Sequence, residues 1–234
     1  MTFPILSKLR GVLISLLALV LGLAAVLLFN TWRLGSLPAT EARPLPVPAD
    51  LDAAAQRLAG AVRIPTISYA AGSAEAAEPD HFADLHRHLA QCFPLVHSRL
   101  RKDVVNGRSL LFTWPGSDPA LQPVLLTAHL DVVPIEPTTA NQWTHEPFSG
   151  DIADGFVWGR GSLDMKHIAM ATLESVEHLL AQGYQPRRTV LIALGHDEET
   201  SGKQGADAIA DLLQQRGRSA RSSRSTKARP SSLA

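Results

Sequence analysis

The chain has 234 residues, enough for one domain with a substantial core or for one domain with appended segments. Its 22 Lys and Arg residues balance its 22 Asp and Glu residues, so the overall charge argues against a nucleic-acid partner. The single cysteine, Cys92, excludes an intramolecular disulfide and a cysteine-rich zinc site, and we expect it to be a small core residue.

The N-terminal segment predicts a membrane helix. An uncharged apolar run extends from Gly11 to Phe29, and it is long enough to cross a hydrocarbon core of about 30 Å. Arg10 precedes the run and Trp32 follows it at interfacial depth. We expect residues 1–34 to anchor a single-pass membrane protein whose remaining chain is extracytoplasmic. A cleaved signal peptide, and therefore a secreted protein, is the alternative. The apolar run is longer than the ~7–15 residues usual for the apolar region of a signal peptide, and no clear cleavage site follows it.

Two further segments differ from a folded domain in composition. Residues 35–49 are rich in proline and predict an extended stalk. Residues 217–234 are rich in Ser and Arg with almost no apolar side chains, which predicts a disordered basic tail. A shift of reading frame near Arg216 is a second explanation for that change in composition. The folded part is therefore expected to span residues 50–216.

Within this part, helical and strand patterns alternate. The predicted helices are 51–62, 80–91, 165–182 and 206–215, and the predicted strands are 109–114, 124–128 and 189–194. The strand 124–128 is apolar apart from Thr127, which is typical of a central strand. The alternation predicts an α/β fold with a mainly parallel sheet flanked by helices. Ligands of such sheets gather at the carboxyl ends of the strands.

Polar clusters occur at three places where the pattern breaks. His129 and Asp131 follow the apolar strand, Asp164 lies in a glycine turn before a helix, and Glu198 and Glu199 follow the last strand. Parallel neighbouring strands would bring all three clusters to the same edge of the sheet. One imidazole and several carboxylates without a thiolate suit a divalent ion such as zinc, manganese or cobalt.

The spacing of these residues suggests their roles. Residues two apart on an extended segment point to the same side, so Asp131 can accept the second ring N–H of a metal-bound His129. Two adjacent glutamates do not easily ligate one ion together, which favours one ligand and one base. An H-x-D pattern alone is a common accident, so the prediction depends on three clusters at strand ends. We expect His145 and His196 to be structural.

The stretches LLTAHLDVVPIEP, NQWTHEPFSGDIADGFVWGRGSLDMK and LIALGHDEETSG carry a family resemblance. They resemble the core of the dinuclear zinc exopeptidase and amidohydrolase family, which includes Gly-Xaa carboxypeptidases, carboxypeptidase S, aminoacylases and N-fatty-acyl amino acid hydrolases. The motifs stand in the family's order and spacing between residues 50 and 216. The resemblance implies a partial zinc-peptidase catalytic domain behind a membrane anchor.

The resemblance also implies roles for each matched residue. It makes His129 and Glu199 metal ligands, Asp164 the carboxylate that bridges two zinc ions, and Asp131 the partner that orients His129. It makes Glu198 the general base, which takes a proton from a metal-activated water and delivers it to the leaving amine. The implied reaction is hydrolysis of a peptide or N-acyl amino acid amide bond.

The sequence also departs from the family pattern. The family has a further acidic ligand beyond the glutamate pair, a histidine ligand nearer the C-terminus, and an inserted lid or dimerisation domain. No acidic residue follows Asp211 and no histidine follows His196. We therefore expect at most one zinc ion and impaired activity, and neither substrate specificity nor oligomeric state can be predicted. The alternative is a non-catalytic truncated or frameshifted product.

Overall fold

The computed structural model describes residues 4–34, 50–70, 73 and 80–227. The chain divides into two units, Met1–Pro48 and Ala49–Ala234. The predicted stalk, residues 35–49, lies outside the described residues.

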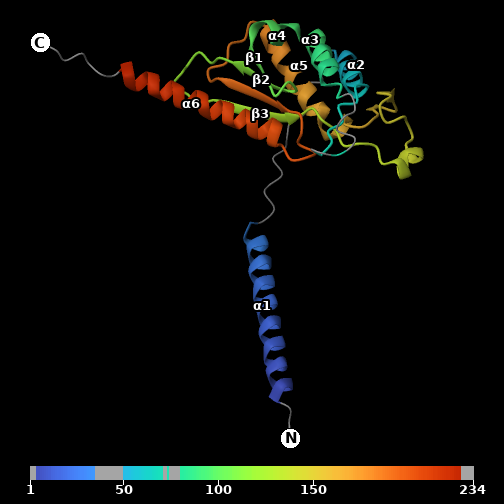
Figure 1. Cartoon of the computed structure of the whole chain (residues 1–234), viewed down its shortest axis with the longest axis vertical. Coiled ribbons are helices and arrows are strands. Elements are labelled where there is room, and N and C mark those ends of the chain that lie inside the picture. Colours follow the sequence, from blue (N-terminus) through green and yellow to red (C-terminus); the bar gives the residue numbers. More distant parts are fainter. Residues whose placement is uncertain (1–3, 35–49, 71–72, 74–79, 228–234) are drawn as a thin grey trace, which may run out of the picture. The chain divides into compact units, whose positions relative to one another are not determined.

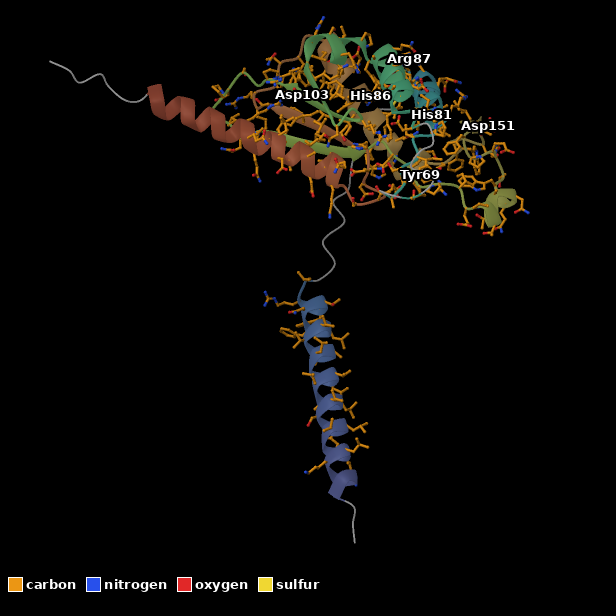
Figure 2. All side chains as sticks on the ribbon, in the orientation of Figure 1. Tyr69, His81, His86, Arg87, Asp103 and Asp151 are labelled. Atoms are coloured by element: carbon orange, nitrogen blue, oxygen red, sulfur yellow. The ribbon has the colours of Figure 1, made fainter. Side chains whose placement is uncertain are left out.

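The first unit contains one helix, α1 (Pro4–Leu34). Hydrocarbon side chains lie along its length (Figure 2), and its leucines from Leu9 onward are exposed. Over Lys8–Leu34 the helix is long and apolar enough to cross a membrane. A signal sequence near the N-terminus can meet the same criteria of length and composition, so this helix is compatible with an anchor and with a signal sequence.

The second unit combines helices with strands. Its helices are α2 (Leu51–Val62), α3 (Phe82–Cys92), α4 (Pro94–Arg99), α5 (His167–Ala181) and α6 (Ala208–Lys227). Its strands are β1 (Arg101–Val105), β2 (Ser109–Trp114), β3 (Val124–His129), β4 (Ile152–Ala153), β5 (Phe156–Val157) and β6 (Val190–Gly195). Three short helical turns are η2 (Pro137–Gln142), η3 (Ser162–Lys166) and η4 (Lys203–Asp207). Each helix and strand predicted from residue 50 onward corresponds to one of these elements.

Helices cover both faces of the sheet (Figure 1). The larger core lies between α2–α5 and one face, where Phe112 and Ile192 are fully buried against helix residues such as Leu173. The smaller core lies under α6, where Leu111 and Ala193 pack against Ile209. Alternate residues of β2 and β6 thus point to opposite cores, as the two-residue period of a strand requires. The predicted α/β class is confirmed.

The sheet is mixed, so the prediction of a mainly parallel sheet needs correction. Its order is β1-β2-β6-β3; β1 pairs with β2 and β2 with β6 antiparallel, and only β3 and β6 are parallel. The sequence analysis missed β1, whose first three residues are charged. Asn106 and Gly107 have φ values of 50° and 75° and close the β1–β2 hairpin, as an Asn-Gly pair favours.

Strand β3 lies at the end of this order, so its predicted central position is wrong. The central strand next to it is β6, which pairs on both sides. Leu125 and Leu126 of β3 are 48% and 39% exposed in the described part of the chain. An apolar strand therefore forms an edge here, although such edges are usually protected by charge or by proline.

Helix α6 is longer than predicted. It continues to Lys227, so the backbone is helical over the first part of the segment 217–234 that was expected to be disordered. Apolar packing of Ile209 fixes its first turns, and Arg216 pairs with Asp103 of β1 at 2.8 Å, a residue labelled in Figure 2. Residues 217–227 are rich in Ser and Arg, and the arginines among them are compatible with continued helix.

The start of η4 is held by a buried carboxylate. Asp197 accepts hydrogen bonds from the backbone N–H of Gln204 at 2.7 Å and of Gly205 at 2.8 Å. A Cβ atom on Gly205 would lie 2.5 Å from Asp197 Oδ1 and 3.1 Å from Ser109 Oγ. The close approach of loop and turn therefore requires glycine at this position.

We expect Gly205→Ala to lower the free energy of unfolding by about 1–3 kcal/mol, because the methyl group must push the Asp197 loop away. Gly217→Ala is the control, since nothing lies within 4 Å of its Cβ position and alanine favours helix. Urea unfolding of the full chain in mild detergent, followed by circular dichroism, measures both. Equal stability of the two variants would contradict the packing argument.

Candidate metal centre

The parallel pairing of β3 with β6 brings two of the predicted clusters together. In this register His129 lies opposite Gly195, and the N–H of Leu130 donates to the Gly195 carbonyl at 2.8 Å. The residues that follow both strands therefore leave the sheet side by side. Asp131 and Glu198 belong to these two neighbouring loops, as the sequence predicts.

His129 is the buried centre of the cluster. Its Nε2 lies 3.1 Å from Asp164 Oδ1 and 3.7 Å from Glu198 Oε2. Its Nδ1 lies 3.0 Å from the main-chain carbonyl of Asp131 and 3.4 Å from the carboxylate of that residue. Burial alone would lower the pKa of His129, but the contacts with Asp131 and Asp164 outweigh it and raise the pKa to about 9.

Asp131 joins the two loops. It is fully buried, and its carboxylate accepts the backbone N–H groups of Glu198 at 3.2 Å and Glu199 at 3.1 Å. Burial alone would raise the pKa of Asp131, but the contact with the His129 side chain, the hydrogen bond from the Glu199 N–H and the charge of His129 lower it overall. Asp131 thus orients the imidazole and also sets the position of the glutamate pair.

Asp164 arrives from a third loop. The turn before it uses Gly161 at a φ of 81°, and a Cβ there would lie 2.5 Å from a methyl carbon of Val132. The Asp164 side chain is 78% exposed, and its Oδ1 contacts His129 Nε2. Two residues later Lys166 is buried, and burial lowers its pKa to about 7 against the opposing charge of Asp131. No role was predicted for Lys166 from the sequence. Its position directly after the Asp164 turn is the sequence feature that could have identified it.

Both glutamates lie near the imidazole. One ligand atom each from His129, Glu198 and Glu199 fall within 4.8 Å of one another. Burial raises the pKa of Glu199, and the neighbouring charges of Asp164, Asp131 and Glu198 add to this against the charge of His129. The expected ligand set contained only one of the glutamates, whereas the structure brings both within reach of a common point.

These residues fit a divalent cation. Asp164 Oδ1 lies 3.1 Å from His129 Nε2, close to the separation of about 3.3–3.6 Å between ligand atoms of tetrahedral zinc, although Asp164 is outside the group formed by His129, Glu198 and Glu199. The donor set of one imidazole and several carboxylates suits zinc and similar ions. The repulsion that raises the pKa of Glu199 would be relieved by a cation at this point.

Other polar residues of the motifs have structural contacts. His196 Nδ1 lies 2.7 Å from Ser109 Oγ, and its ring packs edge-on against Phe82. His145 lies 2.9 Å from Asp151 and stacks on Trp158. The run from His196 to Glu199 thus contains two residues that hold the fold and two that face His129.

A cavity of about 570 Å³ opens on the cluster. His129, Asp164 and Glu198 line it, and it continues between β3 and α6 past Leu125 and Ile209. The candidate site is therefore reachable from solvent and has an apolar neighbour on one side.

Comparisons with known proteins agree with this geometry. Residues 125–226 match the profile of a family described as Peptidase family M20/M25/M40. Carboxypeptidase S of Saccharomyces cerevisiae is 44% identical over 174 residues, which cover 72% of this chain and 30% of that protein. The N-fatty-acyl-amino acid synthase/hydrolase of Bos taurus is 43% identical over 213 residues, covering 88% of this chain and 40% of that protein.

Solved structures show the same fold. Human carnosine dipeptidase 1 aligns with a TM-score of 0.54 and 23% identity, covering 73% of this chain and 38% of that one. The dipeptidase Dug1p of Saccharomyces cerevisiae aligns with a TM-score of 0.53 and 21% identity, covering 70% of this chain and 35% of that one. The chain spans less than half the length of these relatives. The motif residues gather at one edge of the sheet, and residues 125–226 carry a domain of peptidase family M20/M25/M40.

Proposed function

We propose that this chain carries the metal site of an enzyme that hydrolyses a peptide or N-acyl amino acid amide bond. The observation that supports it most is the convergence of His129, Glu198 and Glu199 within 4.8 Å, at the edge where three motif loops meet. The two relatives named above act on substrates of these two kinds by their names, carboxypeptidase and N-fatty-acyl-amino acid hydrolase.

In the proposed site, His129, Asp164 and Glu199 would hold one zinc ion. The Asp164 side chain is 78% exposed, so its carboxylate would also be accessible to a second ion. When bound, zinc would polarise the scissile carbonyl and make water a better nucleophile at neutral pH. Asp131 would keep the His129 ring in the orientation that presents Nε2 to the ion, because Nδ1 is occupied by its contacts with Asp131.

Glu198 is the proposed general base. Its carboxylate lies 3.7 Å from His129 Nε2 and is 63% exposed, so water and substrate can reach it. It would take the proton of the attacking water and return it to the leaving amine. The backbone N–H of Glu198 donates to Asp131 at 3.2 Å, which fixes the main chain that carries this side chain.

We expect the chain as written to be a weak catalyst. Electrostatic stabilisation of a transition state is strongest where water is excluded, yet Asp164 and Glu198 are 78% and 63% exposed here. The alternative is a chain that binds an ion without catalysis. The two proposals share the zinc site and differ in turnover.

The first prediction for this site concerns zinc. The full chain in mild detergent should bind no more than one zinc ion, because His129, Asp164 and Glu199 supply three ligands and leave one position open. Elemental analysis after dialysis measures the stoichiometry. His129→Ala should abolish binding, whereas His145→Ala, which removes a ring paired with Asp151 instead, should retain it. Two tightly held ions per chain would show that the proposed ligand set is incomplete.

The second prediction concerns turnover. Any hydrolysis of dipeptides or N-acyl amino acids by the chain should fall by about 10²–10⁴ in Glu198→Gln, because the general base is lost. Zinc stoichiometry should be unchanged in this variant. Glu146→Gln, at an exposed position outside the cluster, is the matched control. Zinc-dependent hydrolysis that survives in Glu198→Gln would remove Glu198 from the role of base.

The third prediction concerns α1. We propose that it is an uncleaved anchor, so the protein should stay in membranes after carbonate washing and keep its N-terminal residues. Fractionation followed by N-terminal sequencing measures this. A soluble form that begins between Leu37 and Ala42 would identify α1 as a signal peptide.

A further inference from the structure

A short segment after α2, residues 64–68, contacts each of the three loops that carry the site. It contains no proposed ligand and no part of a motif named above. Its only regular pairing is a parallel bridge between Ile67 and Val132. Its hydrogen bonds nevertheless reach parts of the chain that are far apart in sequence.

The first loop is the one after β3. Thr66 is fully buried, and its hydroxyl donates to the Leu130 carbonyl at 2.6 Å. The N–H of Val132 donates to the Thr66 carbonyl at 3.0 Å, and the N–H of Ser68 donates to the Val132 carbonyl at 3.2 Å. These bonds lie on both sides of Asp131, so they fix the backbone between His129 and Val132.

The second loop is the one after β6. The hydroxyl of Ser68 donates to the main-chain carbonyl of His196 at 2.6 Å. His196 stands two residues before Glu198, and the backbone N–H of Ser68 donates to the Val132 carbonyl of the first loop. Ser68 therefore touches both loops that Asp131 connects.

The third loop is the turn that carries Asp164. Lys166 Nζ donates to the carbonyls of Ile64 at 2.6 Å and Ala61 at 2.9 Å. An amine in either protonation state has enough N–H groups for two such bonds. The Lys166 side chain is 1% exposed, so these carbonyls are its anchorage. The turn before α5 is thereby tied to the end of α2 and the start of the 64–68 segment.

We propose that the 64–68 segment, through Thr66, Ser68 and the carbonyl that receives Lys166, is the positioning element of the metal site. It sets the relative placement of the loops that present His129, Asp164 and the glutamate pair. This inference rests on the proposed function, because it concerns the same site. Thr66, Ser68 and Lys166 are positioning residues and do not touch the ion.

Two changes that each remove one hydroxyl test it in the full chain. Ser68→Ala removes the link to the β6 loop, and Thr66→Val removes the hydroxyl link to the β3 loop. Each should weaken zinc binding about 10- to 100-fold, the range found when partners of metal ligands are removed. Each should also change the visible absorption of bound Co²⁺, which reports the geometry of the ligands. Chelator competition measures the affinity.

Ser98→Ala is the matched control. Its hydroxyl also donates to a main-chain carbonyl, that of Pro94 at 2.7 Å, but on α4 outside the site. The melting temperature of Ser98→Ala should fall about as much as that of Ser68→Ala. Its zinc affinity and the absorption spectrum of its bound Co²⁺ should be those of the unaltered chain. A merely structural role for Ser68 would make the two serine variants alike in all three measurements.

Amide hydrogen exchange of the unaltered chain tests the proposal without any variant. Zinc should slow exchange of the Val132 and Ser68 amides and leave that of Gln182, at the end of α5, unchanged. Folded Ser68→Ala and Thr66→Val variants that bind zinc like the unaltered chain would overturn this inference alone, as would unchanged exchange at Val132 and Ser68. No zinc binding by the unaltered chain would overturn the proposed function as well.

Discussion

The candidate site depends on one pairing, the parallel alignment of β3 with β6. Because the register places His129 opposite Gly195, both strands end at the same level of the sheet. The loops that follow are then within hydrogen-bonding distance, and Asp131 can bond the N–H groups of Glu198 and Glu199. An antiparallel pair would send the two motifs to opposite edges. Strands β1 and β2 are added to the other side of β6 in antiparallel orientation and leave this pairing unchanged.

The sequence predicted this edge well and the rest of the sheet less well. His129 and the residues after Gly195 stop apolar runs abruptly, and such a stop is visible without any tertiary information. Strand β1 was missed because Arg101, Lys102 and Asp103 look like loop residues, although Asn106-Gly107 is a hairpin signal. The predicted central position of β3 was wrong. Apolar side chains indicate that both faces of a strand are covered, but they do not indicate whether another strand pairs with each of its edges.

The contacts that hold the loops could not be predicted. Thr66 and Ser68 are common residues in no motif, and their partners, the carbonyls of Leu130 and His196, have the same chemistry at every position of the chain. Lys166 would be assigned to the surface by composition alone, since lysine is rarely buried. Its burial is possible because two carbonyls near the end of α2 receive its N–H groups. Such pairings exist only after the fold has formed.

The carboxylates at this edge divide into two physical kinds. Asp131 and Asp197 are buried and accept backbone N–H groups, so their charge is balanced by the protein itself. Asp164 and Glu198 are mostly exposed, and their nearest charged neighbour is His129. The buried pair sets the geometry, and the repulsion left among the exposed carboxylates and Glu199 favours a cation. Adjacent acidic residues in the chain therefore have different functions. Asp197 fixes the loop, and the two glutamates after it supply the charge that a metal would neutralise.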